Sequence, residues 1–190
     1  MINLIGITGK KRSGKNYFAT ACMNELVRLG HTTHQDAFAN ELKLEAANML
    51  ANFGPLTMSQ YLIEFEGPNK SVYRPFLQWY GTEFKREQMG LQNYWLIALR
   101  DNLVSCVADF VFITDARFLN EAAFLRKRYP TTIVRVSRLD YMSKDPADYH
   151  LSETESIRID ADAEIEAKST PELTVKAALF AGQLSEAAQA

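Results

Sequence analysis

The chain has 190 residues, 47% of them hydrophobic and 23% charged, which is enough for one substantial core and too little for two full-sized domains. Lys and Arg number 21 against 23 Asp and Glu, so a formal charge of -2 excludes a strongly basic nucleic-acid coat and an acidic disordered tail as explanations of the whole chain. Any anion-binding site must therefore be local.

Short apolar runs alternate along the chain with longer segments of helical periodicity. Strands are expected at residues 2–8, 32–35, 109–115, 131–137 and 163–167. Helices are expected at residues 15–29, 37–49, 95–106, 120–128 and 170–184, whereas residues 53–73 are poorly periodic. The alternation predicts an α/β fold in a single domain spanning residues 1–190: a five-stranded, mostly parallel sheet with helices on both faces.

The segment GKKRSGK at residues 9–15 lies between the first predicted strand and the first predicted helix. It matches the GxxxxGK core of a phosphate-binding loop, in which backbone N–H groups face one concavity, the helix start adds its positive dipole and the lysine reaches the outer phosphates. The residues expected to bind ATP are Gly9, Lys10, Lys11, Arg12, Ser13, Gly14, Lys15 and Asn16. The alternative is a basic turn that only connects strand to helix.

Asn16 stands where such loops usually carry a Ser or Thr that meets Mg²⁺. We therefore expect Mg²⁺ to be held mainly by the nucleotide phosphates and by water, with the Asn16 carbonyl oxygen accepting from a metal-bound water.

Asp115 ends the apolar run at residues 109–115, at the edge where open α/β sheets bind ligands. A carboxylate there either holds the hydrated metal or caps the following helix. Arg117 either neutralises phosphoryl charge or pairs with Glu121. The sequence leaves both choices open.

Polar side chains recur every four residues at Arg74, Gln78, Thr82 and Arg86. On a helix they would share one side, where an arginine can grip a monophosphate while Gln78 reads a base edge. The alternative is a solvated helix face with ordinary charge pairs.

Residues 138–155 are polar, and we predict that they form a mobile lid loop. Arg138 would close over the reacting phosphates and exclude water, with Arg135 before it and His150 near the far end. Exposed surface roles for Arg138 and His150 are the alternative.

Four motifs occur in a fixed order: GKKRSGK at 9–15, LQWYGTE at 77–83, ITDARF at 113–118 followed by Asn-Glu, and HLSE at 150–153. In these motifs the chain resembles the phage-type deoxynucleoside monophosphate kinases, a branch of the P-loop nucleoside monophosphate kinases. The resemblance implies the P-loop kinase fold, with ATP on the first loop and the acceptor nucleotide in an insertion at residues 36–95. It also implies a set of acceptor-lining residues: Asp36, Phe38 and Lys43, beside Arg74, Gln78, Thr82 and Arg86.

The hypothesis is transfer of the ATP γ-phosphoryl group to (deoxy)nucleoside 5′-monophosphates, giving the diphosphates needed as precursors for DNA replication. The residues expected to act on the phosphates are Lys15, Arg12, Asp115, Arg117 and Arg138, with Asp115 reaching Mg²⁺ through water. The rivals are a P-loop kinase of another small phosphorylated metabolite, such as phosphomevalonate, and a non-catalytic nucleotide-binding module.

The cysteines and the hydropathy of the sequence indicate the cellular compartment. Cys22 and Cys106 lie far apart and outside any CxxC pattern, which indicates neither a disulfide framework nor a zinc finger. No apolar stretch approaches the roughly 20 residues that span a bilayer. We expect a cytoplasmic protein, in the host cytoplasm if phage-encoded, without membrane or nucleic-acid partners; the resemblance adds a possible homodimer.

Overall fold

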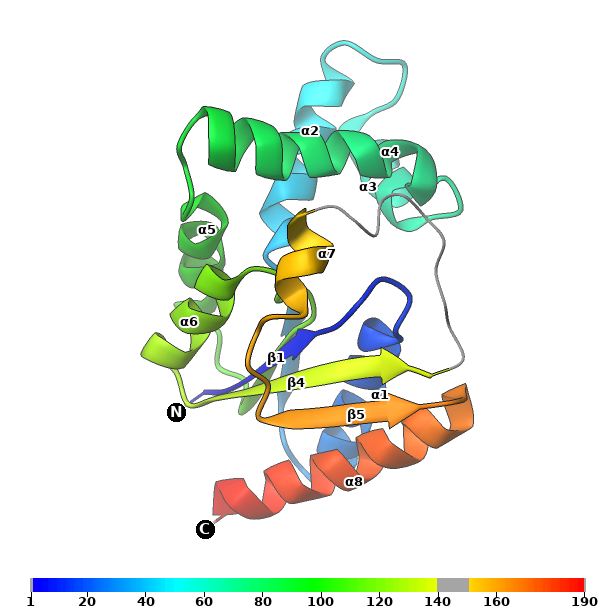
Figure 1. The fold of residues 1–190 in the computed structure, drawn as a ribbon, viewed down its shortest axis with the longest axis vertical. Coiled ribbons are helices and arrows are strands. Elements are labelled where there is room, and N and C mark those ends of the chain that lie inside the picture. The colour runs from blue at the N-terminus through cyan, green and yellow to red at the C-terminus, as the bar shows by residue number, and fades with distance from the viewer. Residues whose placement is uncertain (1, 140–150, 190) are drawn as a thin grey trace. The chain divides into compact units, whose positions relative to one another are not determined.

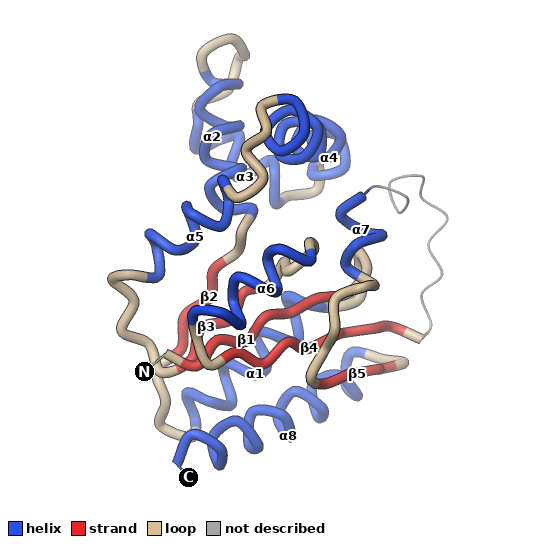
Figure 2. Tube along the Cα trace, turned by 60° about the vertical axis from the view of Figure 1, so that its left-hand side comes forward, coloured by secondary structure: helices blue, strands red, loops and turns tan. Residues whose placement is uncertain are grey.

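The strands form one sheet in the order β2-β3-β1-β4-β5, and every neighbouring pair is parallel (Figure 1 and Figure 2). The structure, a computed structural model, describes residues 2–139 and 151–189. The strands are β1 (Asn3–Thr8), β2 (Thr33–Asp36), β3 (Phe110–Ile113), β4 (Thr131–Arg138) and β5 (Ala163–Ala167). The predicted fold class is confirmed, and the sheet is parallel throughout rather than mostly parallel.

Nine helical elements accompany the sheet in the described ranges: α1 (Lys15–Arg28), α2 (Ala39–Ala51), α3 (Met58–Glu66), α4 (Lys70–Gln78), η1 (Trp79–Gln88), α5 (Tyr94–Leu103), α6 (Leu119–Arg128), α7 (Leu151–Ser156) and α8 (Thr170–Gln189). None of these helices is long and apolar enough to cross a membrane. The chain divides into two compact units. The first unit comprises Met1–Ala37 and Cys106–Ala190, and the second unit comprises Phe38–Ser105.

The first unit contains the sheet and its covering helices. Helices α1 and α8 pack together on one face, and α6 lies on the other face against β1 and β4 (Figure 2). The Phe18 ring of α1 lies 5.8 Å from the Phe180 ring of α8, and the buried Cys22 thiol donates to the Ala177 carbonyl oxygen. Burial raises the pKa of that thiol. This packing holds α1 against the sheet. Because only a short loop separates β1 from α1, the helix begins near the carboxyl end of β1.

The second unit is entirely helical in the described structure, and here the sequence was misleading. Residues 53–73, which are poorly periodic in sequence, contain α3 and the start of α4. A capping box begins α3: Gln60 N donates to Thr57 Oγ1 at 3.3 Å, and Thr57 N donates to Gln60 Oε1 at 2.8 Å. Tyr61 and Phe65 form the buried side of α3. The helix has only nine residues, and the apolar Ile63 is 70% exposed, so the apolar positions do not mark one face in sequence.

Candidate functional site

The loop between β1 and α1 turns back on itself at three positions with positive φ. These are Gly9 (136°), Arg12 (60°) and Gly14 (90°). A Cβ atom on Gly9 would stand 2.2 Å from the carbonyl oxygen of Val136 in β4, so the loop begins in direct contact with the neighbouring strand. Arg12 holds a left-handed conformation that costs a non-glycine residue about 1 kcal/mol. Such cost is typically tolerated at binding and catalytic sites.

The start of α1 places the first N–H groups of a helix at the end of this loop. Gly14 is the N-cap residue and has no side chain that could accept from these groups, and no acidic residue lies in the first turn. The first N–H groups of a helix lack partners inside the helix, and they carry the positive end of its dipole. A phosphate is the kind of ligand that satisfies both.

Two side chains of the loop complete this arrangement. Lys15 Nζ donates to the carbonyl oxygens of Gly9 and Lys10, each at 2.6 Å, so the ammonium lies over the loop. Ser13 is 3% exposed, and its Oγ has no hydrogen-bond partner in the described structure. A buried hydroxyl without a partner costs about 1–3 kcal/mol, which an acceptor oxygen of a ligand would recover. Lys10, Arg12 and Asn16 are exposed around this loop, and Lys11 is half-buried.

The carboxyl ends of β2 and β3 lie beside the end of β1. Ile113 pairs with both Asp36 and Gly6 in the sheet register. Thr114 N donates to the Asp36 carbonyl oxygen at 3.2 Å, and Ala116 N donates to the Ile7 carbonyl oxygen at 3.1 Å. Asp115 therefore lies in the turn after β3, two residues beyond the end of that strand rather than at its last position, and beside the strand that leads into the loop.

The carboxylates at this edge differ in exposure. Asp36 is 6% exposed, and its Oδ1 accepts from Ala37 N at 2.7 Å, whereas Asp115 is half-buried. No cluster of three or more His, Cys, Asp or Glu able to hold a metal occurs in the part of the chain that the structure describes.

The Asp115 turn leads into α6 through Arg117. Glu121, which is 2% exposed, accepts from the backbone N of Arg117 at 2.8 Å and of Phe118 at 3.0 Å. The contact between Arg117 and Glu121 thus includes the Arg117 backbone. The Arg117 side chain is half-buried, as is that of Arg138 at the end of β4. Most of the predicted lid loop, including His150, lies outside the described residues.

In the second unit, the predicted face of four polar residues lies on a helix that changes type. After Gln78 the helix becomes the π-helix η1, and at its end Met89 N donates to the Phe84 carbonyl oxygen, five residues back, at 2.9 Å. Four residues make slightly more than one full turn of an α-helix, which has about 3.6 residues per turn, and slightly less than one full turn of the wider π-helix. The two deviations from a full turn have opposite signs, so Arg74, Gln78, Thr82 and Arg86 stay close to one face.

This face is buried rather than solvated. Thr82 is 6% exposed and Arg86 is 5% exposed, while Arg74 and Gln78 are half-buried. The buried Gln78 Nε2 has no hydrogen-bond partner among the described residues. A buried arginine and a buried amide donor on one side of a helix are groups suited to a phosphate and a base edge. The alternative of an open, solvated helix face does not fit these exposures.

Of the other residues predicted to line the acceptor site, Asp36 ends β2, and Phe38 and Lys43 lie at the start of α2. Lys43 Nζ pairs with Glu66 Oε1 of α3 at 2.5 Å. Phe38 is 4% exposed. The structure thus gives Lys43 an ion-pair partner and Phe38 a buried position within the second unit.

Sequence reasoning missed a charged cluster centred on Glu45. Its carboxylate pairs with Lys85 Nζ at 2.8 Å and accepts hydrogen bonds from the Tyr80 and Tyr94 hydroxyls. Burial alone would raise the pKa of Glu45, but the hydrogen bonds from Lys85, Tyr94 and Tyr80 lower it overall. Burial and the bond to Glu45 raise the pKa of Tyr80 to about 12. The cluster ties α2 to η1 and α5; the distance of 40 residues between Glu45 and Lys85 leaves no local signal for it.

Comparison with known proteins gives a distant structural likeness. No protein-family model and no curated protein matches the sequence. Among solved structures, shikimate kinase from Aquifex aeolicus is 16% identical, with 95% of this chain and 96% of that chain covered and a TM-score of 0.41. At this distance the likeness assigns no activity to the chain.

Proposed function

We propose that the protein is a P-loop kinase that transfers the γ-phosphoryl group of ATP to the 5′-phosphate of a (deoxy)nucleoside monophosphate. The loop of residues 9–15 carries the proposal. Its positive-φ turns, the uncapped start of α1, the Lys15 ammonium over the loop and the buried Ser13 hydroxyl together fit a polyphosphate. No single one of these features would be sufficient.

The acceptor is assigned from the second unit. Arg74 and Arg86 would hold the acceptor phosphate, and Gln78 with its unpartnered Nε2 would meet the base. Asp36, Phe38, Lys43 and Thr82 keep the acceptor-lining roles that the resemblance implies. The acceptor phosphate is already an anion, so no strong general base is needed, and positioning with charge neutralisation supplies the rate.

The donor side uses residues of the first unit. Lys15 and Arg12 would hold the β- and γ-phosphates, while Arg117 and Arg138 would neutralise charge on the transferred group. Mg²⁺, when bound, bridges phosphate oxygens and offsets their charge, and Asp115 would hold one of its waters. Dimerisation, which only the resemblance suggests, stays a prediction.

The experiment is a coupled assay of ADP release with ATP and each of dAMP, dGMP, dCMP and dTMP, with and without Mg²⁺. Lys15→Ala is expected to lower turnover by about 10²-fold or more, because it removes a charge that acts mainly in the transition state. Arg28→Ala, at the exposed far end of α1, is the matched control and should stay near wild type. Near-wild-type turnover in Lys15→Ala would refute the proposal.

The same assay separates the rivals. ADP release that depends on a phosphorylated metabolite such as phosphomevalonate, and on no nucleotide, would indicate a kinase of another substrate. ATP binding without acceptor-dependent ADP release would indicate a non-catalytic module.

A further inference from the structure

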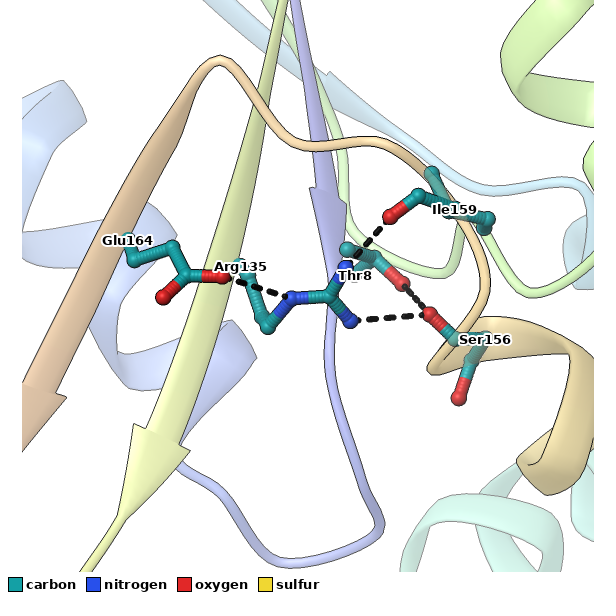
Figure 3. Close-up of polar contacts among 5 residues, drawn as sticks. All are labelled: Thr8, Arg135, Ser156, Ile159 and Glu164. Atoms are coloured by element: carbon teal, nitrogen blue, oxygen red, sulfur yellow. Dashed lines mark hydrogen bonds and ion pairs between the residues drawn. The ribbon is translucent and has the colours of Figure 1, made fainter.

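The carbonyl oxygen of Ser156, at the end of α7, accepts hydrogen bonds from two adjacent strands (Figure 3). Thr8 Oγ1 of β1 donates at 3.2 Å, and Arg135 Nη1 of β4 donates at 3.1 Å. Thr8 and Arg135 are register partners in the sheet. One acceptor therefore joins the end of α7 to both strands at the same level.

Arg135 makes this junction with more than one group. Its Nη2 donates to the Ile159 carbonyl oxygen, and its Nε pairs with Glu164 Oε1 at 3.3 Å on the solvent side (Figure 3). Thr8, Ser156 and Ile159 are each at most 1% exposed. The planar fork of an arginine can serve two carbonyl oxygens and a carboxylate at once, which a lysine ammonium cannot do with the same geometry.

These contacts of Arg135, Thr8 and Ser156 lie next to the start of the proposed phosphate loop, residues 9–15. Thr8 is the residue before Gly9, and Val136, which follows Arg135, has the carbonyl oxygen that a Cβ on Gly9 would strike at 2.2 Å. Consecutive residues of β4 thus contact consecutive residues at the end of β1. A displacement at Arg135 would be transmitted directly to the loop.

The end of α7 also contacts the second part of the donor site. Glu155 Oε2, one residue before Ser156, accepts from Leu119 N at 3.2 Å. Leu119 begins α6, two residues after Arg117. Neighbouring residues of α7 therefore bind the strand that enters the phosphate loop and the segment that follows the Asp115 turn.

We infer that Arg135 is a positioning residue for phosphoryl transfer. By fixing the end of α7 on β4, it holds the phosphate loop and the Asp115–Arg117 turn in a fixed position relative to each other. Arg135 acts through Ser156 and Glu155 and does not itself touch nucleotide. The inference rests on the proposed function, because the groups it aligns are the ones assigned to ATP and the transferred phosphate. Misplacement of about 1 Å can cost 10²-fold in rate, so a residue with no ligand contact can still matter.

The test compares Arg135→Lys and Thr8→Val with Glu164→Gln. The lysine keeps the charge and loses the fork; the valine keeps the β-branched shape of Thr8 and loses the hydroxyl. Glu164→Gln alters only the solvent-side partner of Arg135 and serves as control. For each variant, kcat and KM for ATP and acceptor, affinity for a non-hydrolysable ATP analogue, and amide hydrogen exchange over residues 117–121 are measured.

Arg135→Lys is expected to lower kcat about tenfold or more while changing the KM for ATP less than about threefold, and to speed exchange at the Leu119 amide. Thr8→Val should change the same quantities in the same direction, about threefold, and Glu164→Gln should resemble wild type. Thr8→Val also carries the test if Arg135→Lys fails to fold.

Unchanged kcat per folded molecule with a lowered melting temperature would overturn the inference, because it would show a purely structural role. An equal loss in Glu164→Gln would overturn it as well. If wild type releases no ADP with any acceptor, the proposed function fails separately, and unaltered exchange at Leu119 in both variants would still count against the positioning role.

Discussion

The binding regions proposed for the two units rely on different parts of the chain. In the first unit, the loop of residues 9–15 would bind phosphate through backbone N–H groups presented by turns at Gly9, Arg12 and Gly14. In the second unit, side chains such as Arg86 and the Glu45–Lys85 pair lie within packed helices. A binding site made of backbone groups requires particular residues at particular positions, so a sequence pattern can predict it. A binding site made of side chains depends on which helices pack together, which the sequence does not show directly.

The largest expected effect is on the backbone side of this comparison. Gly9→Ala should abolish detectable ATP binding and destabilise the fold by several kcal/mol, because its Cβ would lie 2.2 Å from the Val136 carbonyl oxygen at a φ of 136°. Gly30→Ala is the matched control: Gly30 has a φ of 93° and nothing within 4 Å of the added atom. It should cost only about 1–2 kcal/mol and leave ATP affinity intact. Calorimetric titration and thermal melts measure both; equal losses would show that conformation alone matters.

A second change addresses side-chain recognition. Arg86→Lys should raise the KM for the nucleoside monophosphate about tenfold or more and leave ATP affinity unchanged, because lysine cannot reproduce a bidentate guanidinium contact. Arg100→Lys, on the surface of α5 beside Asp101, is the control. Steady-state kinetics with each substrate varied in turn give the answer. A rise in the KM for ATP alone would place Arg86 outside the acceptor site.

A third change tests whether the stability of the second unit depends on the cluster around Glu45. Glu45→Gln should lower the free energy of unfolding by about 2 kcal/mol, since it leaves the half-buried Lys85 without a carboxylate. The pKa of Glu45 is lowered in the fold, so its contribution is present above the ordinary carboxylate pKa and is lost as the pH falls below it. Denaturant unfolding at pH 7 and at pH 3 should therefore show a smaller gap between variant and wild type at pH 3. An equal gap would contradict this role.

The smallest effect is expected at alkaline pH. Because the pKa of Tyr80 is raised to about 12 in the fold, the stability it contributes is complete below pH 10 and declines as the pH rises from 10 towards 12. Tyr80→Phe should make unfolding less dependent on pH in that range. Phenolate absorbance during the titration follows the same group, and ionisation of every tyrosine near pH 10 would refute the assignment.

Prediction from sequence was accurate where local rules decide the structure. The last strand, residues 163–167, is found with its predicted bounds, and β3 (Phe110–Ile113) lies inside the predicted run of residues 109–115. Strand and helix periodicities are local, and the loop of residues 9–15 has glycines where the backbone needs them. The capping box of Thr57 and Gln60 was a local signal that was overlooked.

No local sequence pattern predicts the π-helical geometry of residues 79–88. Gly81 lies against Leu42 of α2, where a Cβ would come within 2.9 Å of the leucine Cδ2, and its carbonyl oxygen accepts from Trp95 Nε1 of α5 at 3.1 Å. Packing against neighbours far along the chain therefore accompanies the change of helix type. Arg86, which is 5% exposed, lies on this π-helical segment.

The second unit leaves the sheet after β2 and returns before β3, and these two strands are neighbours in the sheet. Residues 38–105 thus occupy a single crossover, and the loop of residues 9–15, all five strands and α8 are encoded outside it. In the proposed kinase, substitutions, insertions or replacement of that crossover would alter the choice of acceptor without changing the strand order. The architecture would thereby separate the evolution of acceptor specificity from that of phosphoryl donation.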